Sequence, residues 1–220
     1  MKKIVISIGG SLINPGKLNL QFLKELKSTI KSIEQKYKIV IVTGGGQLAR
    51  EYMQPFTKER EKSIMGIEST KLHASLLSHY LGHHRTVARN WQEVKKKIKH
   101  ENLFICGGDI GNVGMTSDGT SAEIAKLIKA DLFINVTNVE GLYSKDPKKF
   151  KDAKRIPRIS NKEFYALIKK HKEKPGQHFI LDKHAARVCK QENIPIVIIK
   201  GIKELKKVLA KKPFKGTFIS

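Results

Sequence analysis

The stretch LFICGGDIGNVGMTSDGTSAEIAKLIKADLFINVTNVEGLYSKDP, residues 103–147, contains the pattern from which the fold of the chain is predicted. An apolar segment of strand type at residues 103–106 leads into a glycine-rich loop, and a helix with an apolar face begins near Asp118. A second apolar strand at residues 132–136 leads into another loop, residues 137–147. Two strand ends and one helix start are therefore expected to meet at one crevice, where open α/β sheets bind ligands.

Asp118 is the first candidate functional residue. It lies at the expected helix start, where backbone N–H groups lack partners within the helix. The simplest interpretation is an N-cap, because aspartate is a favoured capping residue. The glycine-rich approach and the loop after the next strand favour another interpretation, in which the carboxylate faces a ligand. The sequence is compatible with both.

The succession of apolar strand, glycines and helix occurs twice more, upstream of this stretch. Residues 3–8 end in the turn GGS at residues 9–11, and residues 38–42 end in TGGG at residues 43–46. Glycines after a buried strand let a ligand approach the backbone, and their N–H groups can form an anion-binding nest. Arg50 falls one turn into the following helix, where it would suit a phosphate, although a solvated surface arginine is the simpler alternative.

The rest of the chain continues the α/β alternation. Helices are expected at residues 20–33, 64–81, 91–98, 161–170, 178–189 and 202–209, and a last buried strand at residues 194–199. Residues 55–62 are interpreted as a loop or helix end, and Ser160 with Glu163 as a capping box. This pattern predicts one α/β domain with a mainly parallel sheet between helices. Four loops should then open on one edge of the sheet, those after Ile8, Val42, Cys106 and Val136.

The composition restricts the possible classes of protein. The 220 residues carry a formal net charge of +23, but the lysines are spread along the chain and are not interleaved with aromatic residues. This distribution argues against dedicated nucleic-acid binding, while the charge would help to capture small phosphorylated substrates. No apolar run is long enough to span a bilayer, and the first residues do not resemble a signal peptide. Two cysteines, Cys106 and Cys189, fit a reducing cytoplasm.

Several common catalytic motifs are absent from the sequence. It has no GxxxxGK[ST], no convincing GxGxxG, no GxSxG, no HExxH and no paired CxxC. Hydrolase and zinc chemistry therefore lack support. Repeated glycine turns with nearby cations instead suit phosphoryl groups held by backbone amides, and phosphoryl transfer depends mainly on positioning and charge neutralisation.

Five segments, in order along nearly the full chain, resemble the amino-acid kinase family and, within it, the archaeal-type uridylate kinases. They are IGGS (8–11), TGGGQLAREY (43–52), MGIESTKLHASLL (65–77), TSDGTSAEIAKLIKADLFI (116–134) and TNVEGLYSKDPKK (137–149). The resemblance implies a three-layer αβα sandwich with a mainly parallel central sheet. It also implies ATP and Mg²⁺ as cofactors, transfer of the γ-phosphoryl group to UMP to give UDP, and a homohexamer. A boundary near residues 120–131 would separate an acceptor-binding half, about residues 1–120, from a nucleotide-binding half, about residues 121–220.

The resemblance also implies roles for individual residues, each by its match to a family motif. Asp118 would organise the catalytic basic groups, and Lys148 and Arg50 would act on the transferred phosphate. The residues expected to bind ATP are Gly9, Gly10, Ser11, Gly45, Gly46, Arg50, Thr137, Tyr143 and Asp146. The residues expected to bind the acceptor are Gly44, Ser63, Gly66, Gly108, Met115, Thr116 and Ser117. No residue is assigned as a metal ligand.

Two positions depart from the family pattern. Ser7 stands where many members have a lysine that stabilises the transferred phosphoryl group. Ser63 stands where uridylate kinases usually have an aspartate near the acceptor ribose, and the loop at residues 107–118 is slightly longer than usual and lacks a proline. Two alternatives to UMP therefore remain. One is a kinase of the same fold for another small phosphate such as isopentenyl phosphate, although the histidine typical of such kinases is missing at residues 47–49. The other is a nucleotide-binding protein without catalysis.

Overall fold

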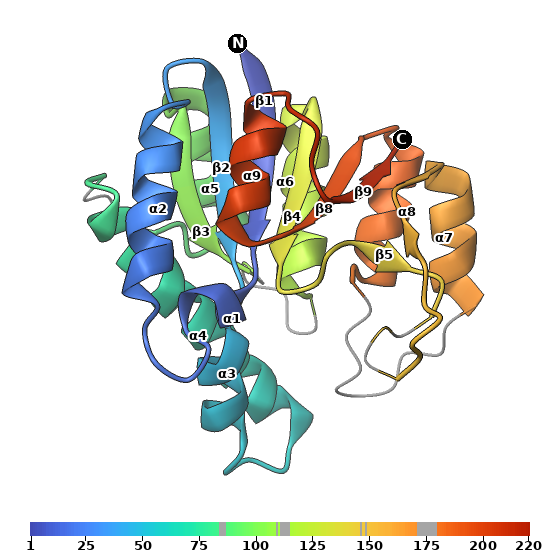
Figure 1. Ribbon diagram of the computed structural model, residues 1–220. Helices are drawn as coiled ribbons and strands as arrows, with labels where there is room; N and C mark the ends of the chain where they lie inside the picture. The colour runs from blue at the N-terminus through green and yellow to red at the C-terminus, as the bar shows by residue number, and fades with distance from the viewer. Residues whose placement is uncertain (84–86, 109, 111–114, 146, 148, 171–179) are drawn as a thin grey trace.

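The computed structural model describes residues 1–83, 87–108, 110, 115–145, 147, 149–170 and 180–220. Its centre is a seven-stranded sheet with the order β3-β2-β1-β4-β8-β9-β7 (Figure 1). These strands are β1 (Lys2–Ile8), β2 (Tyr37–Thr43), β3 (Leu103–Gly107), β4 (Leu132–Thr137), β7 (Arg158–Ile159), β8 (Ile196–Lys200) and β9 (Gly216–Ile219). A separate antiparallel pair consists of β5 (Leu142–Tyr143) and β6 (Arg155–Ile156).

Five neighbouring strands of the large sheet, β3, β2, β1, β4 and β8, run parallel. Only β9 runs against its neighbour β8 within the described sheet, and β7 then pairs parallel with β9. The carboxyl ends of the five parallel strands therefore lie on the same edge of the sheet. This arrangement confirms that the loops after Ile8, Val42, Cys106 and Val136 open on one edge.

Helices cover both faces of the sheet and complete three layers. In chain order they are α1 (Gly10–Ile13), α2 (Leu20–Lys31), α3 (Gly46–Met53), α4 (Glu59–Tyr80), α5 (Trp91–His100), α6 (Ser117–Ile128), α7 (Asn161–Lys170), α8 (Lys183–Gln191) and α9 (Gly201–Leu209). In Figure 1, α2 and α9 lie in front of the sheet. None of the helices in the described part of the chain is both long and apolar enough to cross a membrane.

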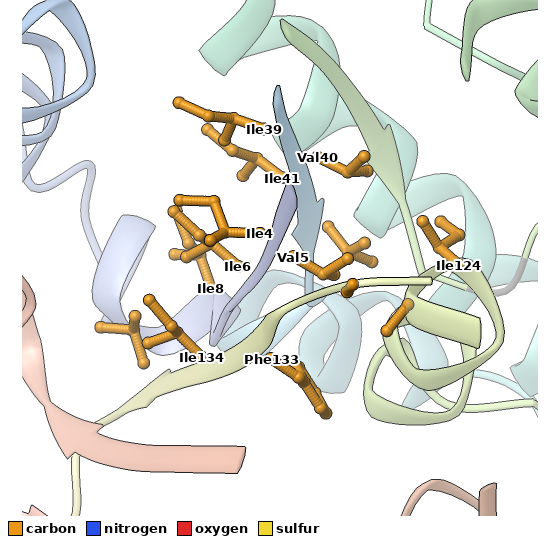
Figure 2. Packing of buried hydrophobic residues seen from close by; sticks show 14 of the residues in the cluster. Ile4, Val5, Ile6, Ile8, Ile39, Val40, Ile41, Ile124, Phe133 and Ile134 are labelled. Atoms are coloured by element: carbon orange, nitrogen blue, oxygen red, sulfur yellow. The ribbon is translucent and has the colours of Figure 1, made fainter. Parts of the chain in front are cut away.

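The core consists of two apolar layers separated by the sheet. The side chains of β1 alternate between them, and all of residues 4–8 are buried. Figure 2 shows Ile4, Ile6 and Ile8 on one side of the strands, and Val5 with Ile124 of α6 on the other. Strands that are buried on both faces read as continuous apolar runs, which is why residues 3–8 and 38–42 could be recognised in the sequence.

The order of the strands defines a switch point at the edge where the parallel strands end. From β1 the chain proceeds to β2 and β3 on one side, and then returns through α6 to β4 on the other side of β1. At such a point the connections leave two neighbouring strands in opposite directions, and a crevice opens between them. The loops after β1 and β4 flank this crevice, and α6 begins beside it.

Two sequence-based boundaries need correction. Helix α4 begins at Glu59, inside the stretch interpreted as a loop, because Glu59 and Glu61 lie in its first turn and complement the unpaired N–H groups there. The helix expected from residue 178 begins at Lys183, where Asp182 caps it, and residues 178 and 179 lie outside the described part. Strand β8 begins at Ile196, after Pro195, as the position of the proline in residues 194–199 indicates. The two-residue strands β5, β6 and β7 were not predicted, because an alternation of period two needs more residues to be visible.

Candidate active site

The glycine turns after β1 and β2 touch each other at the switch point. A Cβ atom added to Gly10 would lie 2.3 Å from the backbone nitrogen of Gly46 and 2.4 Å from the carbonyl oxygen of Gly44. Gly46 has a φ of +60°, a conformation that glycine adopts without steric cost. The backbones can approach this closely only because neither turn carries side chains. The predicted ATP-binding residues Gly9, Gly10, Gly45 and Gly46 are thus brought together, and Ser11 follows them in α1.

Asp118 is not the N-cap of α6. Thr116 has that role, since its Oγ1 accepts a hydrogen bond from the backbone N–H of Gly119 at 3.0 Å. The Asp118 carboxylate instead accepts a 3.1 Å hydrogen bond from the hydroxyl of Ser7, which is buried in β1. The capping interpretation of Asp118 is therefore wrong, and its carboxylate is directed toward the end of β1 at the crevice.

The environment of Asp118 disfavours its charge. Although the residue keeps some exposed surface, loss of water around the carboxyl group raises its pKa to about 7, and the nearby carboxylate of Asp182 contributes in the same direction. The hydrogen bond from Ser7 opposes this shift. Within the described residues, Asp118 forms no ion pair. A carboxylate with a strongly perturbed pKa and no cationic partner, placed in a crevice, is typical of a functional site.

Asp182 is a candidate site residue that was absent from the sequence-based assignment. Its Oδ1 accepts a 2.7 Å hydrogen bond from the backbone N–H of Ala185 and caps α8, and its Oδ2 accepts a hydrogen bond from the hydroxyl of Thr116. Asp182 therefore ties the start of α8 to the start of α6, next to Asp118. Its capping position before an apolar helical pattern was a usable signal, which was lost because the helix was expected to begin five residues earlier, at residue 178.

The predicted acceptor residues lie around the start of α6 and the neighbouring part of α4. A Cβ atom on Gly108 would meet Cα of Ser117 at 2.6 Å, and one on Gly44 would meet the Ser117 hydroxyl at 3.4 Å. Gly66 of α4 lies near Gly45, where an added Cβ would be 3.5 Å from the Gly66 carbonyl oxygen. Ser63 is half-buried, one turn earlier in α4, and Met115 lies beside Gly119 at the start of α6.

His73 is a second residue that the sequence did not reveal. It is buried in α4, and its Nδ1 lies 2.8 Å from the carbonyl oxygen of Gly44. Burial lowers the pKa of His73, which favours the neutral ring, and the carbonyl can only accept a hydrogen bond, so Nδ1 carries the proton. The hydrogen bond from His73 to Gly44 therefore holds the glycine turn after β2 in place.

The segment after β4, which contains residues predicted to bind ATP, forms another side of the crevice. Thr137 ends this strand beside Gly9, where an added Cβ would lie 3.9 Å from the Cα atom of Thr137. The hydroxyl of Tyr143 donates a hydrogen bond of 3.3 Å to Oε2 of Glu140. Two residues of the sequence-based assignment, Asp146 and Lys148, lie outside the described residues.

Arg50 belongs to α3, and its side chain bonds within that helix instead of with the glycine turns. It is exposed, and its Nε donates a 3.0 Å hydrogen bond to Oε1 of Gln47 on the same helix. Its predicted role toward a phosphate would therefore require this side chain to leave Gln47.

Comparison with known proteins identifies the family of this chain. The family model described as amino acid kinase family matches residues 2–200. The chain belongs to the amino acid kinase family. The uridylate kinase of Pyrococcus abyssi is 33% identical to it over 203 residues, which are 90% of this chain and 89% of that protein.

Solved structures extend this relationship to the whole fold. The crystal structure of uridylate kinase from Archaeoglobus fulgidus superposes with a TM-score of 0.87 at 30% identity, covering 100% of both chains. UMP kinase from Ureaplasma parvum superposes with a TM-score of 0.80 at 22% identity, over 100% of this chain and 98% of that one, which supports the fold. The predicted αβα sandwich of the amino acid kinase family is therefore confirmed, whereas the roles of individual site residues remain predictions.

Proposed function

We propose that this protein is a uridylate kinase, which transfers the γ-phosphoryl group of ATP to UMP and yields ADP and UDP. The observation that carries the proposal is the meeting of two glycine turns with the carboxylate of Asp118 at the switch point of the sheet. The full-length similarity to uridylate kinases of archaea supports UMP as the acceptor.

The reaction would proceed by direct displacement. An oxygen of the UMP phosphate forms a bond to the γ-phosphorus of ATP, while the bond from this phosphorus to the oxygen shared with the β-phosphate breaks and ADP leaves. Backbone N–H groups of the glycine turns would hold the donor phosphates, since exposed amides at such turns bind anions. Asp118 would position the cations that follow the moving charge, which is the main contribution a protein makes to phosphoryl transfer.

Mg²⁺ is a further part of this proposal. Within the described part of the chain, no three side chains of the usual metal-binding types lie together. Mg²⁺ in phosphoryl-transfer sites is commonly held by one or two carboxylates together with the substrate phosphates, so such a cluster is not required. Asp118 and Asp182 fit that limited role, and the ion would neutralise phosphate charge.

The two halves of the chain fit the two substrates of this reaction. Strands β2 and β3, with α3 and α4, lie on one side of the switch point and would bind UMP. Strands β4, β8 and β9 lie on the other side and would bind ATP. This division corresponds to a boundary near residues 120–131. A hexamer and a cytoplasmic location complete the proposal; two buried free cysteines suit a reducing compartment.

A coupled assay of ADP formation tests the proposal. The purified protein is supplied with ATP, Mg²⁺ and one of four acceptors: UMP, CMP, dUMP or isopentenyl phosphate. We expect the highest kcat/KM with UMP and no turnover when Mg²⁺ is chelated. A preference for isopentenyl phosphate would assign the protein to another kinase of this fold, and ATP binding without turnover of any acceptor would support a binding protein without catalysis.

A further inference from the structure

We infer that Lys200 binds the phosphates of the donor nucleotide and supplies positive charge that the crevice lacks at Ser7. The inference rests on the proposed function for the identity of the donor. Lys200 belongs to none of the segments that resemble family motifs, and it is the last residue of β8.

The register of the sheet places Lys200 at the donor side of the crevice. In the parallel pairing of β4 with β8, Lys200 lies opposite Thr137, and Val136 lies opposite Ile8 of β1 in the next pair. Because neighbouring strands lie about 4.8 Å apart, Lys200 is roughly 10 Å from the end of β1. A lysine side chain and an extended triphosphate together can span this separation.

The chain around Lys200 leaves its ammonium group available. Residues 196–199 of β8 are buried, whereas Lys200 is exposed at the point where the strand leaves the core. The next residue, Gly201, has a φ of +67°, and an added Cβ there would meet no atom within 4 Å. Open space therefore lies beside the lysine, where a ligand can approach it.

Glu140, an acidic group whose pKa the charge of Lys200 influences, is already engaged by other partners. Glu140 accepts hydrogen bonds from Nζ of Lys215 at 2.7 Å and from the hydroxyl of Tyr143 at 3.3 Å. These contacts, chiefly that with Lys215, lower the pKa of Glu140, and the charge of Lys200 makes a smaller contribution. Lys200 forms no ion pair with any residue that the structure describes. Because Glu140 is bonded to Lys215 and Tyr143, it leaves the charge of Lys200 available for a ligand.

Strand β9 holds this group of residues in place. The backbone N–H of Leu142 donates a 2.8 Å hydrogen bond to the hydroxyl of Thr217, which itself donates to the carbonyl of Ile156 at 2.6 Å. Gly141 packs so closely that an added Cβ would lie 2.6 Å from the Thr217 hydroxyl oxygen. The loop that carries Glu140 is therefore fixed beside the ends of β4 and β8, as a preorganised binding site requires.

The charge balance of the crevice explains why a further cation is needed. ATP brings several negative charges into a crevice whose carboxylate, Asp118, has no cationic partner among the described residues. Ser7 adds a hydroxyl but no charge, and Arg50 is bonded to Gln47 on α3. Lys200 is an exposed cation that the sheet register places beside Thr137, on the proposed donor side, and it has no ion-pair partner among the described residues.

Titration calorimetry with Mg-ATP in the absence of UMP tests this inference. We expect Lys200→Ala to raise the Kd for Mg-ATP about tenfold or more, because a charged hydrogen bond to phosphate is lost. The Kd for UMP and the Tm should be unchanged. Lys200→Arg should restore most of the affinity. The matched control is Lys203→Ala, another exposed lysine, on α9, whose loss should leave the Kd for Mg-ATP unchanged.

Three results would overturn the inference. The first is an unchanged Kd for Mg-ATP in Lys200→Ala, and the second is a Kd for Mg-ATP that rises as much in Lys203→Ala as in Lys200→Ala. The third is a loss of affinity of Lys200→Ala for adenosine, which has no phosphate, as large as its loss of affinity for Mg-ATP. The proposed function is tested separately. If Lys200→Ala binds ATP normally while the wild-type protein phosphorylates UMP, only the inference about Lys200 is wrong. If the wild-type protein does not phosphorylate UMP but Lys200→Ala weakens ATP binding, only the assignment of UMP as the acceptor is wrong.

Discussion

The hydroxyl of Ser7 donates a hydrogen bond of 3.1 Å to Oδ1 of Asp118 and so links the end of β1 to the first turn of α6. The two residues are separated by 111 positions in the sequence. Ser7 leaves the carboxylate with a hydrogen bond but, among the residues that the structure describes, without a countercharge. This bond favours the ionised form of Asp118 and opposes the effect of burial, which raises the pKa of the carboxyl group. The two effects together lead to the first two predictions.

The stability of the ligand-free protein should depend on the ionisation of Asp118. Its pKa is raised from 3.8 to about 7 in the folded state, so the folded protein holds a proton that the unfolded chain releases. The resulting stabilisation is complete below about pH 4 and is lost as the pH rises through about 7. Asp118→Asn should therefore gain Tm relative to the wild type between pH 5 and pH 8. Equal changes in Tm for both proteins over this range would contradict the assigned pKa.

Ser7→Ala should raise the pKa of Asp118 further, because the hydrogen bond from Ser7 favours the ionised form. One such bond corresponds to roughly half a unit to one unit of pKa. We expect the acid limb of the kcat/KM profile to move to higher pH by about that amount. Ser121→Ala is the matched control, since it removes another buried hydroxyl, on α6, that bonds the Ser117 carbonyl. A shift of the same size in the control would refute this origin of the pKa effect.

Gly10→Ala should destabilise the fold at the crevice. The new methyl group would lie 2.3 Å from a backbone nitrogen and 2.4 Å from a backbone oxygen, and neither can move without displacing a strand end. Overpacking of this kind typically costs about 1–3 kcal/mol in the free energy of unfolding. Gly66→Ala is the control, because its methyl group would meet the Met53 sulfur at an ordinary 3.7 Å. Urea unfolding of both variants measures the difference, and a Gly10→Ala protein as stable as the control would disprove the close contact.

Much of the fold could be predicted because parallel strands that are buried on both faces consist of unbroken runs of apolar residues. The strand ends after Ile8, Val42, Cys106 and Val136 followed from these runs and from the glycines after three of them. The crevice followed in turn from their common edge. Partners far apart in the sequence could not be predicted in this way. The bond between Ser7 and Asp118 depends on strand order, and the approach of Asp182 to Asp118 depends on the packing of α8 beside α6. No local pattern encodes either of these long-range arrangements.

The residues on the proposed ATP side of the crevice show more clearly why contacts between distant segments could not be predicted from local sequence. Lys200, Lys215 and Glu140 come from three separate segments that meet only because β9 turns back beside β8. The two-residue strands β5 and β6 give no visible periodicity. Local sequence therefore predicts which loops reach the crevice, whereas the pairing of the carboxyl-terminal strands decides which charges meet there.

Ser63 should weaken the discrimination between UMP and dUMP. It stands in α4, one turn before Gly66, where related uridylate kinases usually carry an aspartate, and a serine has no charge to accept the ribose 2′-hydroxyl. We expect Ser63→Asp to increase the ratio of kcat/KM for UMP over dUMP about tenfold or more, since a charge-assisted hydrogen bond is worth about 1.5–3 kcal/mol. Ser63→Asn is the uncharged control. A wild-type preference for UMP of several thousandfold would show that another group reads the hydroxyl.

The measurement that tests the account most directly is the turnover of Asp118→Asn with saturating ATP, Mg²⁺ and UMP. The amide keeps the shape of the side chain but cannot position cations around the moving phosphoryl group. Loss of one preorganised electrostatic contact typically costs about 2.7–4 kcal/mol, so we expect kcat to fall by about a hundredfold or more. Asp131→Asn, which changes an exposed aspartate just after α6, should keep normal turnover. If Asp118→Asn folds and turns over UMP at a rate near that of the wild type, Asp118 has no part in catalysis, and the active site proposed at the switch point is wrong.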